Sequence, residues 1–137
     1  MIAGVASPGL RLGMISTRLH RFIDYAVAVL LGGLAASRSL SPPVRRALGS
    51  AGAYHAGYSV LTDYEAGLWP WLTMRQHLAL DALGAVALCG AGLLVRQQRP
   101  GERALLVAVG LLELAVVALS RAAPASGPRG DVIAGNV

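Results

Sequence analysis

Two short motifs with the same residue types carry the sequence's clearest chemical potential. His20 and Asp24 are four positions apart, and His77 and Asp81 repeat that spacing. Residues four apart share one face of an α-helix, so each motif presents an imidazole beside a carboxylate. Together, two imidazoles and two carboxylates can bind a divalent metal ion or relay protons. We expect the simpler structural role, in which the carboxylates lie near helix N-termini favoured by the helix dipole and bond to the histidines, and we assign no metal.

Two further ionisable residues lie in the middle of apolar stretches. They are His55, within residues 47–61, and Glu113, within residues 104–120. Ionisable groups inside a bilayer are costly and usually face other helices. We therefore expect the two side chains to approach each other or a shared polar partner; the alternative is a neutral Glu113 hydrogen-bonded to backbone. The polar cluster expected within the membrane comprises Asp24, Asp81, Glu113 and Asp63.

A tetrapyrrole is a second interpretation of the histidines. His55 stands among small residues, Ala51, Gly52 and Ala56, as it would on a helix against which a haem or chlorophyll ring lies flat. His20 and His77 are alternative haem ligands, as a pair. No phosphate-binding loop, nucleophile elbow or zinc-ligand spacing is present, so we predict no catalytic residues and a protein that is not an enzyme.

Composition identifies the class of protein. The chain has 137 residues, of which 55% are hydrophobic and only 14% charged, against about 25% charged in soluble domains. The single cysteine, Cys89, excludes an intrachain disulfide. All twelve basic residues are arginines, and they flank apolar stretches rather than forming the single patch that nucleic acid requires. We therefore predict an integral protein of the cytoplasmic membrane, in contact with lipid and not with nucleic acid.

Four apolar stretches predict four transmembrane helices. They cover residues 22–40, 47–61, 77–95 and 104–120, each near the short end of the length that spans a bilayer. We expect Pro42 and Pro43 to end the first stretch, Pro100 to separate the third from the fourth, and Thr73 and Gln76 to form a capping box. The membrane domain is expected over residues 16–121, between an N-terminal tail, 1–15, and a disordered C-terminal tail, 122–137.

The two halves of the domain match each other when the chain is shifted by 57 positions. His20 then falls on His77, Asp24 on Asp81, and Pro43 on Pro100. The match covers residues 17–64 against 74–121, and it places Glu113 one position past the equivalent of His55. Since each half holds two spans, both halves enter the membrane from the same side, which predicts a parallel repeat. The expected fold is an all-α four-helix bundle built from two helical hairpins.

Three segments resemble a known family. Leu19–Tyr25, Tyr58–Gly67 and His77–Asp81 are similar to segments of the small bacterial membrane proteins with SPW repeats, a likeness that covers residues 17–121. The family's duplicated two-helix plan implies the same arrangement as the repeat. The Ser-Pro-Trp signature itself is absent, because Ser41 and Pro42 are followed by Pro43. The resemblance implies no established activity and no catalytic residue.

Two functions of different classes remain open. The first is a small non-enzymatic subunit that packs within a larger membrane complex or a homo-oligomer. The second is a membrane protein that binds a cofactor or handles ions or protons through the histidines and carboxylates named above.

Overall fold

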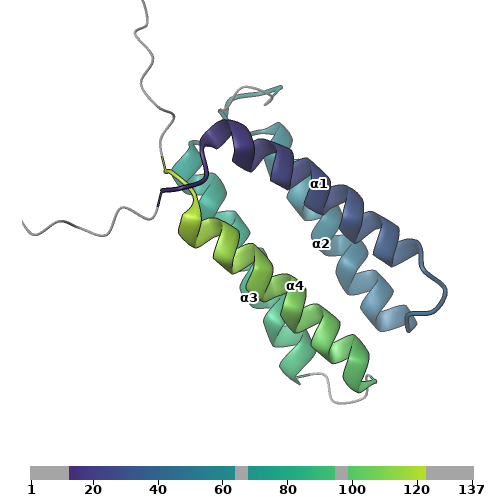
Figure 1. Ribbon diagram of the computed structural model, residues 1–137. Coiled ribbons are helices and arrows are strands. Elements are labelled where there is room, and N and C mark those ends of the chain that lie inside the picture. Colours follow the sequence, from purple (N-terminus) through teal and green to yellow (C-terminus); the bar gives the residue numbers. More distant parts are fainter. Residues whose placement is uncertain (1–12, 64–67, 95–98, 123–137) are drawn as a thin grey trace, which may run out of the picture.

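Four α-helices and no β-strand make up the part of the chain that the computed structural model describes, residues 13–63, 68–94 and 99–122 (Figure 1). The helices are α1 (Thr17–Ala36), α2 (Pro42–Val60), α3 (Met74–Leu94) and α4 (Pro100–Leu119). The all-α class and the number of helices are as predicted. The predicted C-terminal tail, from residue 123 onward, and most of the N-terminal tail, residues 1–12, lie outside the described residues.

Polar caps and prolines set where the helices begin. Ser16 Oγ accepts a hydrogen bond from the Leu19 amide at the start of α1. The predicted capping box of α3 is confirmed, because the Gln76 amide donates to Thr73 Oγ1 and the Thr73 amide donates to Gln76 Oε1. The expectation that Pro42 and Pro43 end the first stretch was wrong, because α1 ends at Ala36 and α2 begins with Pro42. Pro100 lies between α3 and α4 as expected, as the first residue of α4. Proline is favoured at the first position of a helix, because a backbone N–H at that position has no hydrogen-bond partner within the helix.

The helices form two antiparallel hairpins that lie side by side (Figure 1). Within them, α1 packs along α2 and α3 along α4, while the main contact between hairpins joins α2 to α3. Glycines allow the close approach within each hairpin. A Cβ atom on Gly52 would lie 3.2 Å from the carbonyl oxygen of Ala28, and one on Gly110 would lie 2.5 Å from that of Ala85.

The interior of the bundle is divided along its length into an apolar half and a polar half. The apolar half lies toward the turns within the hairpins, and its buried core comprises Leu31, Val44, Leu48, Leu88 and Leu106. The polar half lies toward the end at which α1 and α3 begin. Its buried polar side chains are Thr17, His20, Asp24, His55, Ser59, Thr62, His77, Asp81 and Glu113.

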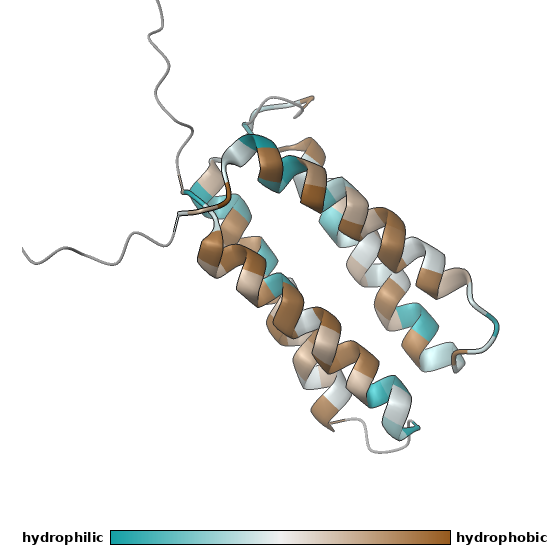
Figure 2. Ribbon diagram, in the orientation of Figure 1, coloured by the Kyte–Doolittle hydropathy of each residue, from teal (hydrophilic) through white to brown (hydrophobic). Residues whose placement is uncertain are grey.

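Hydrophobic residues make up much of the helices (Figure 2). Large apolar side chains are exposed along the bundle, among them Phe22, Val29, Leu30, Leu83, Val86, Leu93, Leu111 and Leu112. Two helices, α1 with 20 residues and α3 with 21, are long and apolar enough to cross a membrane. At 1.5 Å per residue each is about 30 Å long, the thickness of a bilayer's hydrocarbon core.

Candidate metal centre

Two histidines and two aspartates converge inside the polar half of the bundle. His20 and Asp24 come from α1, and His77 and Asp81 from α3; all four are buried. The two Nε2 atoms lie 3.2 Å apart. His20 Nε2 lies 3.2 Å from Asp24 Oδ1 and 3.0 Å from Asp81 Oδ2, while His77 Nε2 lies 3.1 Å from Asp24 Oδ2 and 3.3 Å from Asp81 Oδ2. Each imidazole therefore contacts both carboxylates.

Hydroxyl groups fix the tautomer of both imidazoles. Thr62 Oγ1 donates its proton to the Tyr58 carbonyl, so it can only accept from His77 Nδ1, 2.7 Å away. Ser120 Oγ donates to the Val116 carbonyl and in the same way accepts from His20 Nδ1 at 2.6 Å. When both rings are neutral and each Nδ1 carries the proton, the two Nε2 atoms turn a lone pair toward each other. Two lone pairs at this separation repel each other unless a proton or a metal ion lies between them.

A third imidazole reaches the same carboxylates from α2. His55 Nε2 lies 3.4 Å from Asp24 Oδ1 and 3.8 Å from Asp81 Oδ1. Its Nδ1 lies 2.8 Å from the hydroxyl of Tyr58, which donates its own proton to Asp81 Oδ1. His55 thus follows the same pattern, with Nδ1 on a hydroxyl and Nε2 directed at the centre.

The spacing of these groups suits a transition metal ion. One ligand atom from each of His20, Asp24, His77 and Asp81 lies within 4.8 Å of all the others. A tetrahedral ion held about 2.0–2.1 Å from its nitrogen and oxygen ligands keeps those ligands about 3.3–3.4 Å apart. The nitrogen–nitrogen and nitrogen–oxygen separations among these four residues span 3.0–3.3 Å, and the whole set lies within 4.8 Å, so an ion would fit after the side chains adjust. Imidazole ligands whose other nitrogen bonds to an oriented partner are typical of metal sites.

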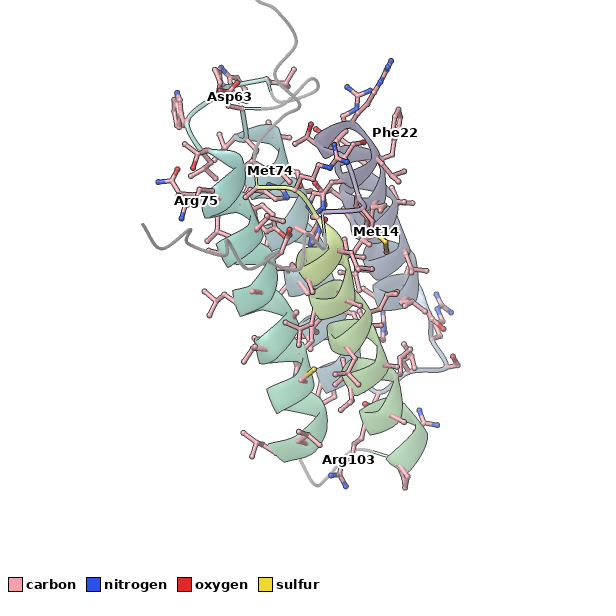
Figure 3. All side chains as sticks on the ribbon, turned by 60° about the vertical axis from the view of Figure 1, so that its left-hand side comes forward. Met14, Phe22, Asp63, Met74, Arg75 and Arg103 are labelled. Carbon is pink, nitrogen blue, oxygen red and sulfur yellow. The ribbon has the colours of Figure 1, made fainter. Side chains whose placement is uncertain are left out.

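The explanation by helix dipoles does not hold for these carboxylates. Asp24 and Asp81 are each the eighth residue of their helices, beyond the first turn where the dipole acts. Asp63 was also wrongly placed in the cluster, because it is exposed in the turn after α2, at the end of the bundle (Figure 3). Its amide donates to the Leu72 carbonyl, so this aspartate follows the end of the helix rather than facing its interior.

Glu113 and His55 do not bond to each other in the described structure, but they share neighbours. Glu113 is buried, and it lines a cavity whose wall also includes Asp24 and Asp81. Asp24 and Asp81, which lie near His55, thus also line the cavity that Glu113 lines. His55 is buried and its Nε2 faces Asp24 of α1, so its imidazole does not point to the outer surface of α2, where a tetrapyrrole ring lying flat would need its ligand.

Sequence reasoning missed the hydroxyl groups that orient the imidazoles. Tyr58 is three positions after His55 and Thr62 four positions after Tyr58, so helical spacing could have placed all three on one face. Ser120 follows the end of α4, and its position beside His20 depends on how the two hairpins pack. No spacing in the sequence predicts that contact.

A second polar cluster joins the hairpins at the opposite end of the bundle. Glu102 Oε1 accepts hydrogen bonds from the Arg99 guanidinium at 2.6 Å and from the Ser41 amide at 2.7 Å. The same guanidinium donates to the Ser39 carbonyl. The Arg99 contact and the Ser41 amide favour the ionised carboxylate and lower the pKa of Glu102 to about 2.

Comparison of the chain with protein-family models, with curated proteins and with solved structures finds no match.

Proposed function

We propose that this chain is a four-span membrane protein that binds one divalent transition metal ion inside the bilayer, through His20, Asp24, His77 and Asp81. The observation that carries the proposal is the pair of Nε2 atoms 3.2 Å apart between two carboxylates. The four donors balance the ion's two positive charges with two aspartates. Two imidazoles among the ligands favour Zn²⁺ or Fe²⁺ over Mg²⁺ and Ca²⁺, which prefer oxygen.

The packing of the hairpins supports four spans. Within the described residues, length and composition alone identify α1 and α3 as helices that could cross a membrane. However, α2 lies antiparallel along α1, and α4 along α3, so a membrane that encloses one helix of a hairpin encloses its partner (Figure 1). The exposed apolar side chains on the outside of the bundle suit contact with acyl chains. The cytoplasmic membrane, with both termini on one side, is the placement that we propose.

Recurring contacts support the duplication. In the first hairpin, Arg45 Nε donates to the Ala35 carbonyl; in the second, Arg103 Nε donates to the Gly92 carbonyl. These pairs imply a shift of 57 positions between α1 and α3 but of 58 between α2 and α4. The buried glycines, Gly52 and Gly110, also stand 58 apart. The ungapped shift of 57 therefore misaligns the second helices by one residue.

With this register, the centre is built from three related pairs of residues. They are His20 with His77, Asp24 with Asp81, and His55 with Glu113. The hydroxyl groups correspond as well, because Thr62 and Ser120 stand 58 positions apart and each bonds to a histidine of the other hairpin. A duplicated hairpin would thus have brought two half-sites together to form one centre.

Metal titration tests the proposal directly. The full chain is purified in lipid nanodiscs, treated with a chelator and titrated with Zn²⁺ in a calorimeter. We expect one Zn²⁺ per chain, and no comparable binding of Mg²⁺. Asp24→Asn should abolish stoichiometric binding, whereas Asp63→Asn, which changes an exposed aspartate outside the centre, should bind as the wild type does.

Two results would contradict the metal proposal. One is a folded wild-type protein that takes up no Zn²⁺; the other is Asp24→Asn binding Zn²⁺ as tightly as the wild type. Helicity and thermal melting without metal show whether each variant is folded. A folded protein without metal affinity would favour the accessory membrane subunit that the sequence also predicted.

A further inference from the structure

His55 has a buried ring nitrogen that no hydrogen bond accounts for. Its side chain is 7% exposed, and its Nε2 has no hydrogen-bond partner among the described residues. That nitrogen lies 3.4 Å from Asp24 Oδ1 and 3.8 Å from Asp81 Oδ1. A buried polar atom without a hydrogen-bond partner is rare in native proteins, so its position calls for an explanation.

The other ring nitrogen of His55 decides what Nε2 can do. The Tyr58 hydroxyl donates its proton to Asp81 Oδ1, so it acts as an acceptor toward His55 Nδ1, 2.8 Å away. A neutral His55 ring then carries its proton on Nδ1 and an unshared electron pair on Nε2. This pair faces carboxylate oxygens, which are themselves acceptors, and a cation between them would stabilise the arrangement.

His55 stands farther out than the four ligands of the proposed centre. It is not among the donors that all lie within 4.8 Å of one another, which are those of His20, Asp24, His77 and Asp81. Zn²⁺ in structural sites almost always takes four ligands, so it needs no fifth donor. In a site with more ligands, donors on opposite sides of the ion are two bond lengths apart, about 4.2 Å. His55 is therefore placed to complete such a site once its ring moves inward.

We propose that His55 is a fifth ligand of the centre, which binds through Nε2 those divalent ions that accept more than four donors and so sets the centre's metal preference. The inference rests on the proposed metal centre and deepens it. Three imidazoles and two carboxylates form a mixed nitrogen and oxygen donor set that suits Fe²⁺ and its stable substitute Co²⁺. The bond from His55 Nδ1 to Tyr58 would orient the ring, as the outer partners of metal-bound histidines do.

Parallel titrations with Co²⁺ and Zn²⁺ test the proposal on the full chain in nanodiscs. His55→Ala should weaken Co²⁺ binding by about 10–100-fold or more, because the loss of an outer partner alone has an effect of that size. Its Zn²⁺ affinity should change much less, because the four other ligands remain. Added imidazole fits the space that the side chain leaves and should restore Co²⁺ binding. It should also reduce the visible absorption of the bound Co²⁺, which is stronger with four ligands than with five.

Ser59→Ala is the matched control on α2. Ser59 is a fully buried polar residue four positions after His55, and its hydroxyl has no partner among the described residues, so this variant should bind both metals as the wild type does. Unchanged Co²⁺ affinity of His55→Ala would overturn the fifth ligand alone, and so would an equal loss of both metals or a loss that imidazole does not restore. A wild-type protein that binds neither metal would contradict the proposed centre itself, and this inference with it.

Discussion

Removing the hydroxyl that orients His77 should weaken metal binding without changing any metal ligand. Thr62 is fully buried, and its Oγ1 lies 2.7 Å from both His77 Nδ1 and the Tyr58 carbonyl. Thr62→Val keeps the volume of the side chain but leaves the Nδ1 proton without an acceptor, and no water can reach the site. Loss of such a partner typically lowers metal affinity about 10–100-fold, equivalent to about 1.4–2.7 kcal/mol.

The controls for this variant follow from the same geometry. Thr62→Ser retains the hydroxyl and should keep nearly the wild-type Zn²⁺ affinity, while losing about 1 kcal/mol of stability with the buried methyl group. Ser120→Ala removes the corresponding partner of His20, but Ser120 is partly exposed, so water can replace it and the loss should be smaller. Competition with a chromophoric chelator gives the three affinities. Equal Zn²⁺ affinity of Thr62→Val and the wild type would refute this account of the tautomers.

Two further predictions concern the packing of the bundle and its far end. Gly110→Ala should destabilise the protein by about 1–3 kcal/mol in thermal melting, because the new Cβ would lie 2.5 Å from the Ala85 carbonyl oxygen. In the control Gly57→Ala, the new Cβ meets no atom within 4 Å, so this variant should be neutral or stabilising. Equal melting temperatures of the two variants would refute the close approach of α3 and α4. Because the pKa of Glu102 is lowered from 4.5 to about 2, its contribution to stability is complete above about pH 4.5 and is lost as the pH falls toward 2. Glu102→Gln should therefore reduce the slope of stability against pH in that range, and an unchanged slope would show that its bonds to Arg99 and Ser41 contribute nothing.

The sequence predicted the helices well because their signals are local. Apolar composition and the capping residues predicted four helices, and the shared spacing of His20 with Asp24 and of His77 with Asp81 predicted two equivalent faces. The helix starts were predicted three to five residues too late. The first turns of the helices contain polar residues, so a search for apolar stretches begins too late. In addition, proline was interpreted as ending one helix where it is the first residue of the next.

The composition of the centre could be predicted only in part, because it depends on contacts between hairpins. Both aspartates and all three histidines were identified from their rarity in apolar surroundings. Asp63 was included wrongly, since a polar residue just past a helix end cannot be distinguished by sequence from one inside it. The one-residue change of register that we propose between α2 and α4 also hid the proposed correspondence of His55 with Glu113. The packing of Arg45 and Arg103 against the preceding helices supports it, as do the buried glycines Gly52 and Gly110.

X-ray absorption spectroscopy of the Zn²⁺-loaded wild-type protein tests the central claim most directly. The account predicts four nitrogen or oxygen ligands at about 2.0–2.1 Å, with the outer scattering that two imidazole rings produce. A sulfur ligand at about 2.3 Å would place the ion at Cys89 instead, and a shell of oxygen ligands without imidazole scattering would place it at carboxylates alone. Either result would contradict a centre formed by His20, Asp24, His77 and Asp81.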